Sequence, residues 1–206
     1  KKVFVVVLDY NGHKNTLELL SSLQKLRQED FDLYIVVIDN YPQDPIKLNH
    51  SDYKDLNLHV IYNRQNLGFS GGNNIGINYS QKAGADYVII LNNDTLVEPN
   101  FVWELIKVAG SDERTGIVVP KIYFAKGFEF HKDRYKESER GRVIWYAGGL
   151  IDWNNVIGAH RGVDEVDIGQ YEQVWETQLA TGCCLLIKKE VLKKIGGYDE
   201  KHFLYY

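Results

Sequence analysis

The chain has 206 residues, enough for one sizeable α/β domain, although two small domains would also fit within that length. Hydrophobic residues make up 44% and charged residues 25%, which is not the composition of a disordered chain, and a formal net charge of −4 argues against broad binding to nucleic-acid phosphates. Apolar runs fall short of the ~20 residues of a membrane span, so no transmembrane segment is expected.

Runs of β-branched and apolar residues predict buried strands in the first half of the chain, over 3–8, 34–38, 58–62 and 87–91. Helices are expected after the first strand, capped by Thr16, over 72–82, and after the last of these strands over 101–108. A short strand over 117–119 ends at Pro120. This alternation is typical of an α/β sheet that binds nucleotides.

The second half of the chain is less regular. Residues 126–142 are rich in charge and have no clear period, so we expect an exposed, mobile insertion, either a solvated loop or a lid over an active site. Strands are predicted over 143–151 and 179–187, followed by a helix over 189–195 that ends at Gly196. The adjacent Cys183 and Cys184 lie in an apolar stretch, which indicates buried, reduced thiols.

Polar residues follow each of the four predicted buried strands, at 9–11, 39–40, 63–66 and 92–94. Ligands of an open parallel sheet bind at the carboxyl ends of its strands, so these residues are expected to converge at one edge. The glycine-rich turn 66–74 offers backbone N–H groups to an anion, and Asp94 offers a carboxylate to a hard cation. Together they predict a site for a metal-bound diphosphate. The alternative is that Asp and Asn simply favour turns and helix caps.

Other nucleotide-binding and hydrolase motifs do not occur in the sequence. Its glycines do not form Gly-x-Gly-x-x-Gly, and neither Gly-Lys-Ser/Thr nor Gly-x-Ser-x-Gly is present. The histidines have no zinc-ligand spacing, and each is predicted to be structural or on the surface: His13, His50, His59, His131, His160 and His202. These observations argue against a dinucleotide-binding dehydrogenase, a P-loop protein, a serine hydrolase and a zinc site.

Six segments resemble, in order, the motifs of glycosyltransferase family 2, particularly its rhamnosyltransferase-like members: Val-Val-Val-Leu-Asp-Tyr-Asn-Gly (5–12), Val-Val-Ile-Asp-Asn (36–40), Asn-Leu-Gly-Phe-Ser-Gly-Gly-Asn-Asn-Ile-Gly (66–76), Leu-Asn-Asn-Asp-Thr (91–95), Thr-Gly-Cys-Cys-Leu-Leu-Ile (181–187) and Gly-Gly-Tyr-Asp-Glu-Lys-His-Phe-Leu-Tyr-Tyr (196–206). The resemblance implies a GT-A fold, with a single Rossmann-like nucleotide-binding sheet and a mixed acceptor-side C-terminal part. It implies one glycosyltransferase domain over 1–206, with a nucleotide-sugar-binding half over 1–120 and an acceptor-side half over 121–206 that is truncated at its C-terminus.

The activity implied by the resemblance is inverting transfer of a sugar from a UDP- or dTDP-sugar to an acceptor hydroxyl. The acceptor would be a glycan or lipid-linked glycan in the assembly of cell-envelope polysaccharide or glycoconjugates, in the cytoplasm or at the inner face of the membrane. Two other classes stay open. One is a nucleotide-sugar-binding module without catalysis, and the other is a nucleotidyltransferase, which should carry a basic glycine-rich loop where this chain has Asp9-Tyr10-Asn11-Gly12.

The resemblance also implies roles for individual residues. Asp39 would recognise the pyrimidine base, and the rest of the donor would be bound by Asp9, Tyr10, Asn11, Asn66, Gly68, Phe69, Asn73 and Asn93. Asp94 would contact Mg²⁺ or Mn²⁺ on the diphosphate. Position 92 is Asn where many relatives carry Asp, so the metal would have one carboxylate fewer and would bind weakly without the donor.

The resemblance says less about the acceptor side. Thr181 and Gly182 would lie there, and Arg161 would reach a donor phosphate unless it belongs to a solvated turn. The family's general base would fall after Tyr206, so the catalytic residue is unknown, and the carboxylates to consider within the chain are Asp152, Asp199 and Glu200. Three tryptophans are either core residues or platforms for a sugar: Trp145, Trp153 and Trp175.

Overall fold

The computed structural model describes residues 1–27 and 30–204, so Tyr205 and Tyr206, the end of the last family motif, lie outside the described residues. The chain divides into two compact units. The first contains Lys1–Val118 and the segment from Gly182 onward, and the second contains Val119–Thr181. Each unit has its own strands and its own packed residues.

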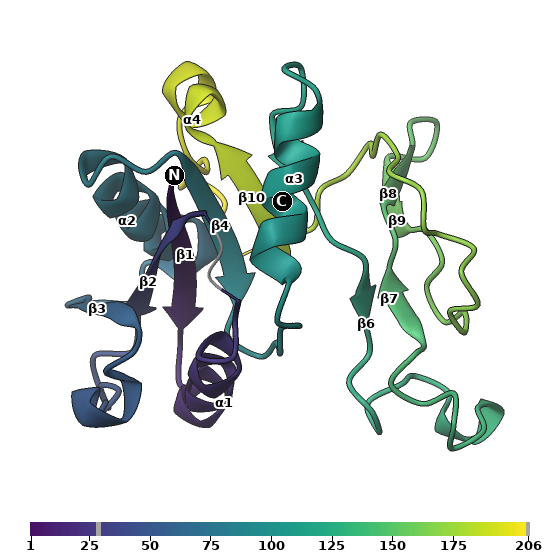
Figure 1. Ribbon diagram of the computed structural model, residues 1–206, viewed down its shortest axis with the longest axis horizontal. Helices are drawn as coiled ribbons and strands as arrows, with labels where there is room; N and C mark the ends of the chain where they lie inside the picture. The colour runs from purple at the N-terminus through teal and green to yellow at the C-terminus, as the bar shows by residue number, and fades with distance from the viewer. Residues whose placement is uncertain (28–29, 205–206) are drawn as a thin grey trace. The chain divides into compact units, whose positions relative to one another are not determined.

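The first unit is built on a six-stranded sheet with the strand order β3-β2-β1-β4-β10-β5 (Figure 1). The first four strands along the chain are parallel: β1 Lys2–Asp9, β2 Asp32–Asp39, β3 Asn57–Tyr62 and β4 Tyr87–Asn92. β10 (Cys184–Lys188) pairs antiparallel with both β4 and β5 (Ile117–Val118). The central strands β1, β2 and β4 are buried along almost their whole length, as their uninterrupted apolar runs predict.

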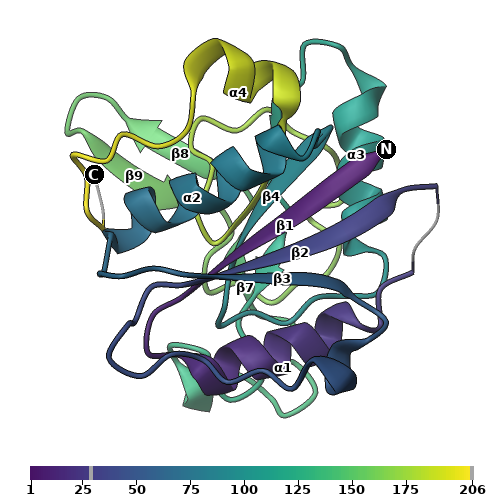
Figure 2. The ribbon, with the colours of Figure 1, turned by 90° about the vertical axis from the view of Figure 1, so that its left-hand side faces the viewer.

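Two long helices, α1 (His13–Leu23) and α2 (Gly68–Lys82), lie on opposite sides of these strands (Figure 2). α2 lies very close to β1, since a Cβ at Gly72 would come within 2.4 Å of Leu8 Cδ1 and one at Gly76 within 2.3 Å of Val6 Cγ1. Two further helices, α3 (Phe101–Ser111) and α4 (Lys189–Ile195), and the 3₁₀ turn η1 (His50–Tyr53) complete the unit. The helices predicted over 101–108 and 189–195 are confirmed.

The starts of α1 and α2 differ from the prediction. α1 begins at His13, and Thr16 lies inside it, fully buried, where its hydroxyl oxygen accepts a hydrogen bond from the Asn93 amide (3.0 Å) instead of capping the helix. α2 begins at Gly68, four residues before the predicted start, and the Gly68 N–H donates to the Asn66 side-chain oxygen (2.9 Å) where the chain enters the helix. The Thr16 contact joins residues that are far apart in the sequence, so a local pattern does not predict it.

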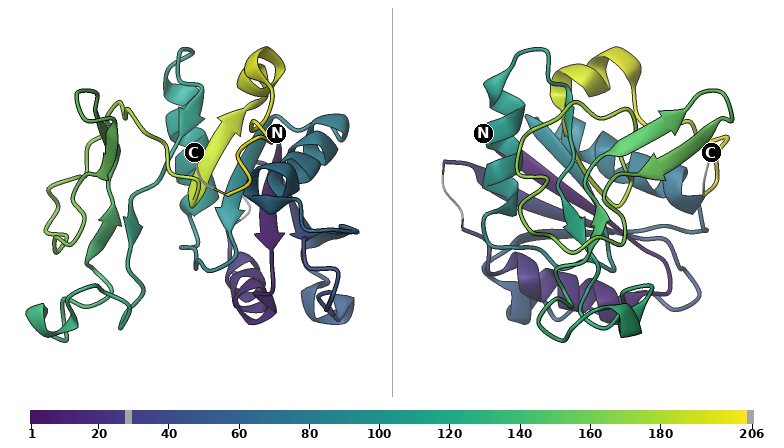
Figure 3. Two further views of the ribbon diagram at one scale, coloured as in Figure 1. Left: turned by 180° about the vertical axis from the view of Figure 1, so that it is seen from behind. Right: turned by 90° about the vertical axis from the view of Figure 1, so that its right-hand side faces the viewer.

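The second unit contains two short antiparallel pairs (Figure 1, Figure 3). β6 (Ile122–Tyr123) pairs with β7 (Ile144–Tyr146), and β8 (Gly149–Asp152) pairs with β9 (Ile157–His160). The single strand predicted over 143–151 is therefore wrong: Gly148 has φ +110°, and this left-handed backbone ends β7 before β8 begins. The strand predicted from residue 179 begins only at Cys184.

Residues 126–142 form turns and the 3₁₀ turn η2 (Lys132–Arg134), but they are not only a solvated loop. The buried Glu129 carboxylate accepts the N–H groups of Gly127 (2.9 Å) and Gly141 (2.8 Å). Burial alone would raise the pKa of Glu129, and these backbone hydrogen bonds outweigh it and hold the pKa below its usual value. Tyr135 is also buried, in a cluster with Phe124 and Val143. The expectation of a wholly exposed insertion is wrong at these positions.

Candidate functional site

The carboxyl ends of the four parallel strands lie at one edge of the sheet, as predicted. Asp9 and Asp39 are direct neighbours in the register of β1 and β2, and Asn92 is paired with Leu8 across β1 and β4. On the other side Asp39 is paired with Tyr62 of β3. The polar residues that follow these strands therefore belong to one continuous edge.

The Asn40 side chain holds the glycine-rich turn 66–74 at this edge of the sheet through hydrogen bonds. Its side-chain amide is almost fully buried and donates to the Asn66 side-chain oxygen (2.9 Å) and to the Gly68 carbonyl (3.1 Å). Its side-chain oxygen accepts from the Asn63 amide and the Leu67 N–H, both at 3.0 Å. Every polar atom of this side chain thus has a partner, so Asn40 sets the path of the chain into α2.

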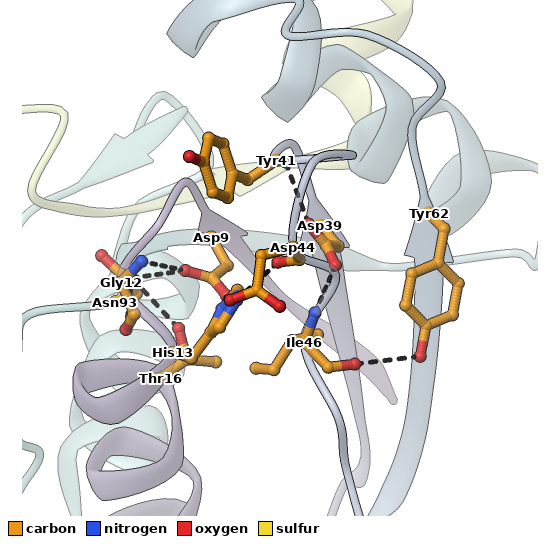
Figure 4. A network of polar contacts seen from close by, with 10 residues as sticks. All are labelled: Asp9, Gly12, His13, Thr16, Asp39, Tyr41, Asp44, Ile46, Tyr62 and Asn93. Carbon is orange, nitrogen blue, oxygen red and sulfur yellow. Dashed lines mark hydrogen bonds and ion pairs between the residues drawn. The ribbon is translucent and has the colours of Figure 1, made fainter.

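Asp39 lies at the back of a cavity of about 360 Å³, which is also lined by Pro42, Pro45, Ile46, Lys47, Tyr62 and Asn63. The carboxylate is 1% exposed and accepts the N–H groups of Tyr41 (2.9 Å) and Ile46 (2.7 Å), so it fixes both ends of the 41–46 loop (Figure 4). Tyr62 closes one wall, and its hydroxyl donates to the Ile46 carbonyl (3.4 Å). The cavity has a mainly apolar wall and one carboxylate, which suits a flat ring with an N–H group.

Asp9 is completely buried at the end of β1. One carboxylate oxygen accepts from the Gly12 N–H (2.9 Å) and the Asn93 amide (3.2 Å), and the other lies 2.5 Å from His13 Nδ1. Asp9 therefore organises the turn into α1. The exposed residues of this turn are Tyr10, whose ring meets Tyr41 edge-on at 5.2 Å, and Asn11.

His13 was not predicted at the site, and Asn40 was expected at the sheet edge but was given no role there. His13 was predicted to be structural or on the surface, but it touches Asp9 and, through Nε2, the Asp44 carbonyl (2.7 Å) (Figure 4). Its position four residues after Asp9, at the start of a helix that follows a strand, is a signal that could have drawn attention to it. The role of Asn40 in holding the turn has no such signal, because its hydrogen-bond partners come from residues 63–68.

Asn93 and Asp94 follow β4 but face different surroundings. The Asn93 amide donates to Asp9, to the Gly12 carbonyl (3.4 Å) and to Thr16, which ties the end of β4 to the start of α1. Asp94 is exposed. Within residues 1–27 and 30–204, no group of three His, Cys, Asp or Glu side chains could hold a metal ion. The exposed Asp94 carboxylate alone does not supply enough ligands for a metal ion. It is a suitable ligand for Mg²⁺ or Mn²⁺ when a diphosphate supplies further oxygen ligands.

The first turn of α2 is in contact with the C-terminal segment. The Phe69 N–H, one of the groups expected to face an anion, donates to the Phe203 carbonyl (2.6 Å). A Cβ at Gly68, which has φ +69°, would come within 2.2 Å of that oxygen, so only glycine allows this approach. Asn73 is 1% exposed, and its side-chain oxygen has no hydrogen-bond partner. Gly182 lies beside the Phe69 ring, where an added Cβ would be 3.2 Å from Cζ.

Arg161 and Thr181 belong to the second unit. Arg161 Nε donates to the Ala147 carbonyl (2.7 Å), and its guanidinium lies 5.0 Å from the centre of the Tyr171 ring and 5.4 Å from that of Trp175. Thr181 is buried. In the same unit Trp145 is half-buried against His160, while Trp153 and Trp175 are exposed.

The carboxylates considered as a general base have structural contacts. Asp152 accepts the N–H of Asn154 (2.9 Å) and caps the turn between β8 and β9. Asp199 accepts the Lys201 N–H (3.0 Å), and Glu200 accepts the Asn74 amide (2.9 Å). In the part of the chain that the structure describes, no helix is long and apolar enough to cross a membrane.

Comparison with known proteins gives two curated relatives. The low-salt glycan biosynthesis hexosyltransferase Agl10 of Haloferax volcanii is 25% identical over 205 residues, and the dTDP-rhamnosyl transferase RfbF of Shigella flexneri is 28% identical over 204 residues. The matches cover 98% and 99% of this chain, but only 57% and 60% of the relatives. The chain therefore spans less than two thirds of their length.

Solved structures match the fold. S. aureus TarS 1–349 in complex with UDP matches with a TM-score of 0.61 and 18% identity, over 98% of this chain and 52% of that one. GalNAc-T7 with UDP, GalNAc and Mn²⁺ matches with a TM-score of 0.64 and 19% identity, over 100% and 38%. With the mostly parallel sheet, these matches confirm the GT-A fold. Because the profile described as Glycosyl transferase family 2 matches residues 4–196, the chain belongs to that family.

Proposed function

We propose that this chain binds a pyrimidine nucleoside diphosphate sugar and transfers the sugar, with inversion, to an acceptor hydroxyl. The observation that carries the proposal is the cavity beside Asp39, which opens at the sheet edge that also carries Asp9 and Asp94. Family membership and the hexosyl- and rhamnosyltransferase relatives support the reaction class.

Asp39 is the residue proposed to select the base. Both carboxylate oxygens already accept one backbone N–H each, but a carboxylate has about four lone-pair positions, so a further N–H can be accepted. Uracil and thymine present N3–H, whereas cytosine presents a lone pair at N3 that a carboxylate repels. The base would stack within the wall formed by Pro42, Pro45 and Tyr62.

Asp94 is proposed to hold Mg²⁺ or Mn²⁺ together with the diphosphate. The bound metal would neutralise charge on the leaving diphosphate. This chain's own contribution is to fix the end of β4, because Asn93 bonds to Asp9, Gly12 and Thr16 and thereby sets where Asp94 stands. Asn66, Gly68, Phe69 and Asn73 remain the residues proposed around the ribose and diphosphate.

The general base is proposed to lie outside the carboxylates discussed above, as the family resemblance implies. Asp152, Asp199 and Glu200 each accept hydrogen bonds that shape a turn or a chain segment. The acceptor is proposed to be a glycan or lipid-linked glycan, and the protein is proposed to act in the cytoplasm or at the inner face of the membrane. The names of the relatives support a role in glycan assembly.

Calorimetric titration with UDP, dTDP, CDP, GDP and ADP, each with Mn²⁺ and with EDTA, tests the proposal. We expect UDP and dTDP to bind more tightly than the other three, and more tightly with Mn²⁺. Preference for a purine nucleotide would reject the assignment of the cavity. Release of UDP from a UDP-sugar in the presence of an acceptor separates a transferase from a module that only binds the donor.

A further inference from the structure

The 41–46 loop, which forms one wall of the Asp39 cavity, is held by two carboxylates. Asp39 accepts its first and last N–H groups, from Tyr41 and Ile46. Asp9 holds the loop indirectly, because His13 lies between Asp9 and the carbonyl of Asp44 (Figure 4). His13 is thus the connection between the end of β1 and the middle of the loop.

Both groups that face the His13 ring are acceptors. Nε2 lies 2.7 Å from the Asp44 carbonyl oxygen, which can only accept, and Nδ1 lies 2.5 Å from an Asp9 carboxylate oxygen. A neutral imidazole has one N–H, whereas an imidazolium has two. The ring can therefore donate to both an ionised Asp9 and Asp44 only when it is protonated. Asp9 is fully buried, and a buried carboxylate requires such a partner.

The surrounding charges favour the protonated ring. The acidic groups that face it are Asp9, Asp39 and the Asp44 side chain, whose carboxylate is 3.9 Å from Nε2. Burial would lower the pKa of His13, but the hydrogen bonds to Asp9 and Asp44 and the charges of Asp9 and Asp39 outweigh it and raise the pKa above the ordinary value of 6.5. His13 therefore donates hydrogen bonds to both Asp9 and Asp44 below pH 6.5. The hydrogen bond to Asp44 is lost as the pH rises through the raised pKa of His13.

Deprotonation of the His13 ring would break its hydrogen bond to the Asp44 carbonyl and leave its hydrogen bond to Asp9. The hydrogen bond to the Asp9 carboxylate is charge-assisted and stronger than the bond to a neutral carbonyl, so the remaining proton stays on Nδ1. Nε2 would then direct a lone pair at the Asp44 carbonyl oxygen. Deprotonation therefore releases the 41–46 loop from His13, whereas Asp9 keeps its hydrogen bond.

We propose that His13 is a positioning residue for the nucleoside pocket: as an imidazolium it ties the 41–46 loop to Asp9 and holds the cavity wall in the shape that binds the base. His13 does not line the cavity, so it acts through the loop. This inference rests on the proposed function, because it assigns the cavity to a nucleoside. It adds that donor binding is coupled to one proton on His13.

The test is UDP binding by wild type, His13→Gln and Lys14→Ala at pH values from 6.0 to 8.5, with Mn²⁺. Gln keeps a polar side chain but carries no charge and does not titrate in this range. Lys14 is the control, since its side chain is 87% exposed on the same helical turn. UDP's own titration affects all three proteins equally, so the ratio of dissociation constants reports on the side chain at position 13.

We expect His13→Gln to bind UDP on the order of 10-fold more weakly than wild type at pH 6.0, which is the effect of losing one charged hydrogen bond. The ratio should approach 1 above the pKa of His13, and Lys14→Ala should follow wild type throughout. A ratio near 1 at pH 6.0, or a ratio that does not change with pH, overturns the proposal. A purely structural role for His13 would lower the unfolding temperature without this pH profile.

Nitrogen-15 NMR of the nucleotide-free wild type gives a second measurement that needs neither UDP nor a stable variant. We expect both ring nitrogens of His13 to be protonated at pH 6.5 and the amide shifts of Asp44 and Ile46 to titrate with the same midpoint as the ring. The proposed connection between His13 and the loop is overturned if only one ring nitrogen of His13 is protonated at pH 6.5. It is also overturned if the amide shifts of Asp44 and Ile46 do not titrate with the ring. If wild type binds no UDP at any pH while the loop follows His13, the proposed function fails and the anchoring role of His13 stands.

Discussion

At the scale of single residues, the two strand-end aspartates have different tasks although both are buried. Asp9 is enclosed by Gly12, His13 and Asn93, and it contributes to the site through these neighbours. Asp39 also binds backbone N–H groups, but it lines the cavity. The difference arises because the chain after β2 turns away to leave space beside Asp39, whereas the chain after β1 folds directly into α1.

Asp39→Asn should abolish the discrimination between UDP and CDP. The Asn oxygen can accept only one of the Tyr41 and Ile46 N–H groups, and its NH₂ group can donate to cytosine N3. We therefore expect the UDP preference to fall by roughly 10- to 100-fold, the range of a charged hydrogen bond. The measured quantity is the ratio of the two dissociation constants, since loosening of the loop weakens both ligands. An unchanged ratio would contradict base recognition by Asp39.

Asp94→Ala should remove the gain in UDP affinity that Mn²⁺ provides. Loss of the single carboxylate leaves the metal with the diphosphate and water, and we expect a loss of about 2 kcal/mol in binding free energy with metal and little change with EDTA. Calorimetry under both conditions measures this. Asp55→Ala, which removes an exposed carboxylate elsewhere in the first unit, should keep the full metal effect. Equal wild-type affinities in Mn²⁺ and EDTA would contradict the metal role.

The residues that sequence could predict are those whose chemistry follows from their position along one element. Asp39 is the last residue of β2 and Asp94 lies two residues after β4, so the sequence could predict that both lie at the carboxyl edge of the parallel sheet. The contacts of Asn40 with residues 63–68 and of His13 with Asp44 could not be predicted, because these partners come from other segments. A hydrogen bond between residues that are distant in the sequence depends on the course of the backbone in the folded protein, which local sequence patterns do not specify.

At the scale of elements, α2 connects the carboxyl edge of the sheet to the C-terminal segment. The helix contacts β1 through its glycines and is joined to the chain after α4 by the Asn74 side chain. The Asn74 amide donates to the Tyr198 carbonyl and to Glu200, both at 2.9 Å, and its oxygen accepts the Tyr198 N–H (2.8 Å). A Cβ at Gly197 would come within 2.3 Å of that oxygen, which explains a glycine there.

Asn74→Ala should lower the free energy of unfolding by about 1–3 kcal/mol, because it leaves the N–H and C=O of Tyr198 without their partner. Asn74→Asp is the informative second variant. It keeps an acceptor for the Tyr198 N–H but brings a carboxylate against the Tyr198 carbonyl and Glu200, so it should be at least as destabilising. Urea unfolding measures both. If Asn74→Asp is as stable as wild type at pH 7, the three hydrogen bonds do not hold the segment.

The element boundaries that the sequence could not predict are places where a side chain or a glycine overrides the local pattern. α2 starts at Gly68, whose N–H is held by the Asn66 side chain, and the run 143–151 divides because Gly148 takes a left-handed backbone. In 126–142 the frequency of charge predicted a solvated loop, and yet Glu129 is buried with backbone partners. Composition gives the average environment of a segment, whereas the fold decides each position.

At the scale of the whole molecule, the two units hold different parts of the proposed machinery. The first contains the Asp39 cavity, the glycine-rich turn and Asp94, all of which are proposed to bind the donor. The second contains Arg161 and Thr181 together with exposed aromatic side chains. Family resemblance alone assigned Arg161 to a phosphate of the donor. Its contacts within the second unit favour a role in holding that unit together.

Arg161→Ala should therefore destabilise the protein and leave the dissociation constant of UDP within about twofold of wild type. The substitution removes the hydrogen bond to the Ala147 carbonyl and the contacts with Tyr171 and Trp175, together worth roughly 1–3 kcal/mol. Arg161→Lys keeps the charge but lacks the planar guanidinium that lies against both rings, so it should be nearly as destabilised. Thermal unfolding and UDP calorimetry on the same samples distinguish the two roles. A UDP affinity at least 10-fold weaker in Arg161→Ala, partly restored in Arg161→Lys and without a change in unfolding temperature, would show that the guanidinium binds phosphate and that donor recognition extends into the second unit.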